Sequence, residues 1–68
     1  MLKFRLAAFY GVDEPENGKR RGDCAIRSTH DGPCSMAPLI ETFRARPDIG
    51  WIEITDLETN ETKREYLR

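Results

Sequence analysis

The stretch LKFRLAAFY, residues 2–10, decides the fold because its apolar side chains recur at every second position. A period of two is typical of a β-strand that lays one face on a hydrophobic core. Leu2, Leu6 and Phe9 also fall on one side of a helix, so a helix is the competing interpretation. The unbroken alternation favours the strand. Its predicted core face comprises Leu2, Phe4, Leu6, Ala8 and Tyr10.

The segment that follows, residues 11–23, is polar and predicts a long loop. Asn17-Gly18 within it is a strong turn signal, because both residues tolerate a positive φ. Residues 24–29 predict a short second strand, and residues 30–33 have the composition of a turn. Long loops in compact domains are often functional or mobile.

A helix is predicted from Ser35, as its N-cap, to Arg46. The spacing assigns Pro38 to the first turn, where its missing N–H breaks no helical bond, and Pro47 ends the helix. Four apolar residues at positions i, i+3, i+4 and i+7 form one stripe that would cover a sheet. They are Met36, Leu39, Ile40 and Phe43.

The last part of the chain predicts a β-hairpin. Residues 51–56 alternate again with Ile52 and Ile54 on one face, and residues 62–67 form the returning strand. Asn60 is expected in a left-handed turn conformation between them. The predicted class is therefore α+β: a small antiparallel sheet of three to four strands with one helix packed on one face, in the order β-β-α-β-β.

The length of 68 residues predicts a single domain, residues 1–68, with no room for a large enclosed catalytic cleft. Such a domain buries only about 60% of the surface that its unfolded chain exposes, so its core is thin. We therefore expect no enzymatic activity and no cofactor. A net charge of −1 argues against a dedicated nucleic-acid binder, whose surface is usually strongly basic.

The N-terminal residues lack the continuous apolar run of a signal peptide, and no segment has the length of a membrane span. We therefore predict a cytoplasmic protein with no membrane partner. In a reducing cytosol the two cysteines are expected as free thiols, with a disulfide between them as the alternative.

Cys24, His30 and Cys34 are the candidate metal ligands, with Asp31 as a conceivable fourth. Thiolates and imidazole are good zinc ligands, but their spacing here lacks the close ligand pair of structural zinc sites. A small zinc module is therefore an alternative hypothesis, and the primary prediction is that no metal binds. Cys34 near a helix start, with His30 close in sequence, is also the minimum for a thiol nucleophile. It lacks a third orienting group and a pocket.

Two clusters of charge make the chain polarised. The basic cluster comprises Lys19, Arg20 and Arg21, with Arg27, and predicts either a solvated loop or a contact with nucleic acid. From residue 48 onward six acidic residues face three basic ones. The acidic residues of the hairpin are expected along one acidic face; they are Glu53, Asp56, Glu58, Glu61 and Glu65.

Phe9 and Trp51 are out of phase with the core positions of their strands, so both are expected on the sheet face opposite the helix, together with Tyr66. Exposed aromatic residues there predict either shallow packing against the long loop or an anchor for a partner.

These features favour a non-enzymatic protein-binding module, such as a small inhibitor or adaptor. Phage anti-defence proteins, anti-CRISPR inhibitors among them, are comparable in size and charge. The predicted partner-binding residues combine the acidic hairpin with exposed aromatics and are Trp51, Glu53, Glu58, Glu65 and Phe9. The alternatives are a homodimer through the same aromatics, a nucleic-acid-contacting protein that uses Lys19, Arg20, Arg21 and Arg27, and the zinc module.

Overall fold

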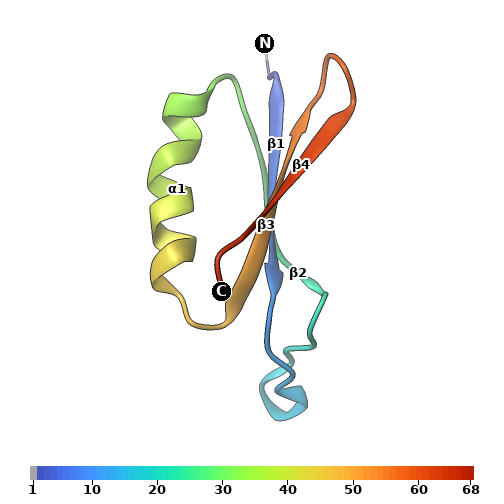
Figure 1. Ribbon diagram of the computed structural model, residues 1–68, viewed down its shortest axis with the longest axis vertical. Helices are drawn as coiled ribbons and strands as arrows, with labels where there is room; N and C mark the ends of the chain where they lie inside the picture. Colours follow the sequence, from blue (N-terminus) through green and yellow to red (C-terminus); the bar gives the residue numbers. More distant parts are fainter. Residues whose placement is uncertain (1) are drawn as a thin grey trace.

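The alternating stretch forms strand β1 (Phe4–Tyr10), which lies inside a four-stranded antiparallel sheet of order β2-β1-β3-β4 (Figure 1). The computed structural model describes residues 2–68 and confirms the predicted α+β class and the order β-β-α-β-β. The remaining elements are the 3-10 helix η1 (Pro15–Asn17), β2 (Cys24–His30), α1 (Pro33–Ala45), β3 (Ile49–Asp56) and β4 (Glu61–Tyr66).

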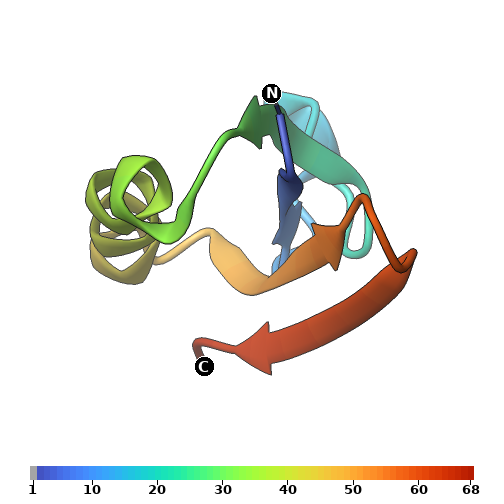
Figure 2. The same ribbon diagram turned by 90° about the horizontal axis from the view of Figure 1, so that it is seen from above.

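Helix α1 lies on one side of the sheet and connects β2 to β3 across β1 (Figures 1 and 2). The core between helix and sheet contains the predicted stripe and the predicted strand faces. Met36 and Phe43 are buried in it, and Leu39 and Ile40 pack at its edge. The strands contribute Leu6, Ala8, Ile49 and Ile52. Leu2, assigned to the core by its alternation, lies before the strand and is 57% exposed.

The helix begins earlier than predicted. Gly32 is its N-cap and Pro33 its first residue, so the prediction of Ser35 as the cap is wrong. Proline is favoured at the first helical position, because its fixed φ suits the helix and its missing N–H has no partner there. Ser35 instead lies in the first turn, where its hydroxyl donates to the Gly32 carbonyl oxygen at 3.2 Å.

This earlier start also moves Pro38 into the interior of the helix, so its assignment to the first turn is wrong. An interior proline cannot donate the hydrogen bond to the carbonyl four residues earlier, which here belongs to Cys34. Both Cys34 and Pro38 are exposed, so this part of the helix faces solvent and not the core. The helix therefore tolerates Pro38 on its solvent side.

Two of the predicted turns are confirmed, one at Gly18 and one at Asn60. Gly18 adopts a left-handed φ of 74° after η1, and Glu14 and Lys19 pair across this tip of the loop. Asn60 adopts a φ of 62° between β3 and β4. Asp56 stabilises the second turn, because its Oδ1 accepts a hydrogen bond from the backbone N–H of Glu58 at 2.9 Å.

Within residues 2–68, no helix combines the length and the apolar character that crossing a bilayer requires.

Candidate functional site

The sheet face opposite α1 is the candidate site, and no helix covers it within residues 2–68 (Figure 2). Directly paired residues of antiparallel strands point to the same face, so the strand register defines which side chains gather there. Three rows, each crossing β2, β1, β3 and β4, make up this surface, hereafter the open face. They are Cys24, Phe9, Trp51 and Tyr66; Arg27, Ala7, Glu53 and Arg64; and Thr29, Arg5, Thr55 and Thr62.

The first row contains three adjacent aromatic rings. Phe9 and Trp51 stack with centroids 5.6 Å apart and an angle of 11° between the ring planes. Tyr66 lies on the other side of Trp51 at 6.0 Å and is 64% exposed. The prediction that these three residues gather on the face opposite the helix is confirmed. The alternation of β1 and β3 sets their direction, and the register places them side by side.

Arg64, in the second row, contacts both the aromatic row and Glu53 beside it. Its guanidinium carbon lies 5.7 Å from the centroid of the Trp51 ring and 5.9 Å from that of Tyr66, within cation–π range. Nη1 donates to the Tyr66 hydroxyl at 3.1 Å, and Nε and Nη2 donate to Glu53 Oε2 at 3.2 and 2.9 Å. These bonds, that to Tyr66 first, raise the pKa of Arg64, so the guanidinium stays charged.

Trp51 also borders a small pocket of about 180 Å³ at the end of the aromatic row. Arg21, Tyr66 and Arg68 line it from other segments. The Nε1 atom of Trp51 is buried and has no hydrogen-bond partner within residues 2–68. Buried polar groups are usually hydrogen-bonded, so this buried N–H is an exception among the side chains of the aromatic row.

The predicted acidic residues do not share one face. Glu53 lies on the open face, whereas Glu65 pairs with Ile52 in the register and therefore lies on the helix side. There its Oε1 accepts a hydrogen bond from Arg44 Nη2 at 3.0 Å. Glu58 lies exposed in the turn between β3 and β4. Because side chains of β4 alternate between faces, they separate charges that are close in sequence.

The predicted basic cluster is separated in the same way. Arg27 lies on the open face, directly across from Ala7. Arg20 and Arg21 are exposed in the turn before β2. Lys19 forms an ion pair instead, with its Nζ 3.2 Å from Asp48 Oδ2.

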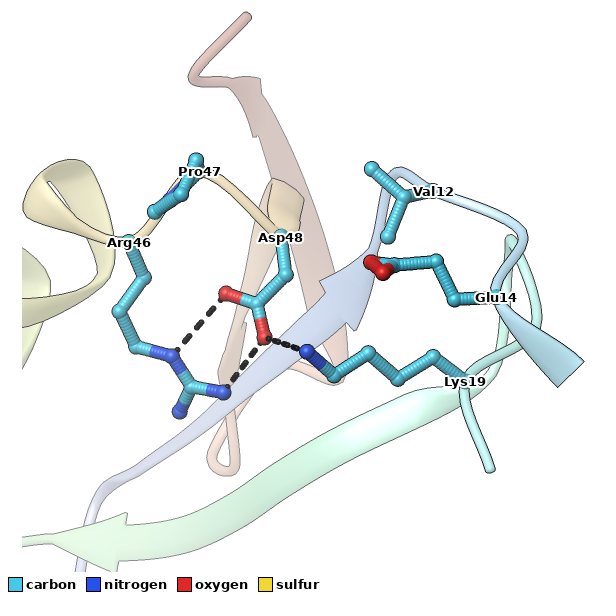
Figure 3. Close-up of a pocket in the computed structure, with 6 residues that line it drawn as sticks. All are labelled: Val12, Glu14, Lys19, Arg46, Pro47 and Asp48. Atoms are coloured by element: carbon cyan, nitrogen blue, oxygen red, sulfur yellow. Dashed lines mark hydrogen bonds and ion pairs between the residues drawn. The ribbon is translucent and has the colours of Figure 1, made fainter. Parts of the chain in front are cut away.

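Asp48 is the centre of a charge cluster that sequence patterns did not reveal (Figure 3). Arg46 donates to it through Nε at 3.1 Å and Nη2 at 2.7 Å, while Lys19 reaches it from the loop. The hydrogen bonds from Arg46, and then from Lys19, lower the pKa of Asp48 from 3.8 to about 2. The cluster borders a pocket of about 350 Å³ and fastens the loop to the corner between α1 and β3.

Replacing Asp48 with asparagine is expected to lower the free energy of unfolding by about 1–2 kcal/mol at neutral pH. The folded-state pKa of Asp48 is depressed, so its stabilisation is complete above about pH 5 and is lost progressively as the pH falls through 3.8 towards 2. Urea unfolding of both proteins should therefore show a difference at pH 7 that narrows near pH 2. Asp13→Asn, at an exposed position, is the control. An unchanged difference at both pH values would contradict this role.

The three candidate metal ligands are not brought together. Cys24 and His30 stand at opposite ends of β2, roughly 20 Å apart for a strand of this length. His30 Nε2 lies 2.7 Å from Ser28 Oγ, and His30 Nδ1 lies 3.0 Å from Ser35 Oγ. Both cysteines are exposed free thiols. In the part of the chain that the structure describes, no group of three histidine, cysteine or acidic side chains is placed to hold a metal ion.

Comparison with known proteins shows no similarity from which a function could be inferred. No protein-family model matches it, and no curated protein and no solved structure matches it either.

Proposed function

We propose that this protein is a non-enzymatic protein-binding module that contacts its partner through the open face. The observation that carries this proposal is the row of Phe9, Trp51 and Tyr66 on a sheet face that no helix covers within residues 2–68, with Arg64 against two of the rings. Tryptophan, tyrosine and arginine are the residues most enriched among the hot spots of protein interfaces.

A small inhibitor or adaptor is the role that suits such a module, and an anti-defence protein of a phage or mobile element is one example. A domain of 68 residues has space for one binding face and little else. We place its action in the cytoplasm, because a reducing compartment keeps exposed thiols such as Cys24 and Cys34 free.

The geometry of the aromatic row favours a protein partner over nucleic acid. Bases stack on ring faces that are open to solvent. Trp51 is flanked by Phe9 on one side and by Tyr66 and Arg64 on the other, so its ring faces are already in contact with neighbours. The net charge of −1 also weakens long-range attraction to phosphates.

Affinity capture with the immobilised protein, from an extract of the cells that produce it, tests the proposal. Tyr66→Ala and Trp51→Phe are expected to weaken capture of the partner at least about tenfold, because each removes part of a hot spot. Circular dichroism should show that both variants remain folded.

Leu2→Ala is the matched control, since Leu2 is an exposed apolar side chain outside the open face. It should capture the partner as the wild type does. Equal capture by the wild type, Tyr66→Ala and Trp51→Phe would show that the open face is not the interface.

A further inference from the structure

The open face is basic although the chain as a whole is slightly acidic. Its three rows contain three arginines, Arg5, Arg27 and Arg64, against one acidic residue, Glu53. The local net charge is therefore +2, in a chain whose net charge is −1. The excess of negative charge lies elsewhere, since Glu61 and Glu65 pair with residues of β3 on the helix side.

The arginines of the open face differ in whether their guanidinium groups form an ion pair. Arg64 is held by Glu53, whose Oε2 accepts two of its N–H donors. Arg5 and Arg27 are exposed and form no ion pair within residues 2–68. An unpaired guanidinium is a fork of donors that matches a carboxylate in two parallel hydrogen bonds. The face therefore presents two unpaired guanidinium groups that can bind carboxylates, Arg5 on β1 and Arg27 on β2.

We propose that the partner of the open face is an acidic protein segment, whose carboxylates pair with Arg5 and Arg27 and whose apolar side chain packs on the aromatic row. This inference rests on the proposed function and specifies the chemistry of its partner. Charge complementarity disfavours a second copy of the chain, because two faces of net charge +2 repel each other. The contacts on both sides of Trp51 disfavour stacked bases.

Glu53 then acts as an internal competitor. Its carboxylate gives Arg64 the contact that a partner carboxylate would otherwise supply. Glu53→Gln removes a negative charge from the face and loosens Arg64, so it is expected to strengthen binding of an acidic partner about threefold or more. An acidic hairpin that recognised a basic partner would instead lose affinity on the same substitution.

The test is a titration with a synthetic peptide that carries glutamates on both sides of a central phenylalanine. Trp51 is the chain's single tryptophan, so its fluorescence reports occupancy of the open face directly. We expect a saturable change in Trp51 fluorescence, and an affinity for the peptide that falls as salt is added. Arg5→Glu and Arg27→Glu should each weaken binding at least about tenfold. Lys63→Glu makes the same charge change on the helix side of β4, and should change affinity less than about threefold.

Several outcomes would overturn the inference. They are no saturable response to the peptide, an affinity that Arg5→Glu and Arg27→Glu leave unchanged, and binding of single-stranded oligothymidylate in place of the peptide.

Capture from extract separates the two proposals. If Tyr66→Ala loses the partner while Arg5→Glu and Arg27→Glu retain it, the acidic partner is wrong and the protein-binding function stands. If all three variants retain the partner, both proposals fail.

Discussion

Replacing Gly50 with alanine is expected to lower the free energy of unfolding by about 3 kcal/mol, which approaches the whole stability of a domain of this size. A Cβ on Gly50 would lie 2.6 Å from the Cα of Gly11, and a Cβ on Gly11 would lie 2.5 Å from the Cα of Gly50. Both obstacles are backbone atoms, which cannot rotate away as a side chain can. The two strands have to separate to admit either methyl group.

The close approach of these glycines follows from an irregularity in the β1–β3 pairing. Phe9 pairs with Trp51, but Tyr10 pairs with Ile49, which leaves Gly50 as the extra residue of β3. Such a bulge bends the strand. Around it, the Gly11 N–H donates to the Asp48 carbonyl at 2.9 Å and the Leu67 N–H donates to the Gly50 carbonyl at 2.9 Å. Separation of the strands would therefore disturb three segments together.

Urea unfolding followed by circular dichroism measures this effect. Gly32→Ala is the matched control, because Gly32 has an extended φ of −170° and a Cβ there would meet no atom within 4 Å. That control should lose no more than about 1 kcal/mol, the usual difference between glycine and alanine at an N-cap. A Gly50→Ala protein with the wild-type midpoint would contradict the close packing at this position.

The fold was predictable where apolar residues recur with the period of a strand or a helix. The alternation of residues 2–10 identified β1, and the stripe from Met36 to Phe43 identified the face of α1 that packs on the sheet. The first residue of the helix was not predictable from the sequence. Both Pro33 and Ser35 belong to residue types that favour a helix N-terminus, and the backbone conformation of Gly32 decides between them. The contact between Gly11 and Gly50 has no local signal at all.

The candidate site was predictable only in part, for a related reason. Phe9 and Trp51 are out of phase with the core, so each could be assigned to the open face from its own strand. Which charges accompany them depends on the register between strands, which joins Arg27 and Arg64 to one row. Composition alone suggested an acidic hairpin, but β4 directs Arg64 to the open face and Glu65 to the helix side.

Replacing Phe43 with alanine is expected to lower the free energy of unfolding by about 3–5 kcal/mol, enough to leave much of the protein unfolded. Phe43 is 1% exposed and is the largest of the fully buried side chains between α1 and the sheet. Its truncation removes apolar contacts and leaves a cavity that a thin core cannot close. Thermal unfolding of the alanine variant and of the milder Phe43→Leu variant measures the loss.

Tyr66→Ala completes the comparison, because it removes an aromatic ring from the other face of the same sheet. Tyr66 is 64% exposed on edge strand β4, so its loss should lower the free energy of unfolding by no more than about 1 kcal/mol. We expect Phe43→Leu to keep partner capture while it lowers the unfolding temperature. Tyr66→Ala should lose partner capture while its unfolding temperature stays close to that of the wild type. A Tyr66→Ala protein as unstable as Phe43→Ala would mean that the aromatic row is a second core, and the open face would then lose its standing as a binding surface.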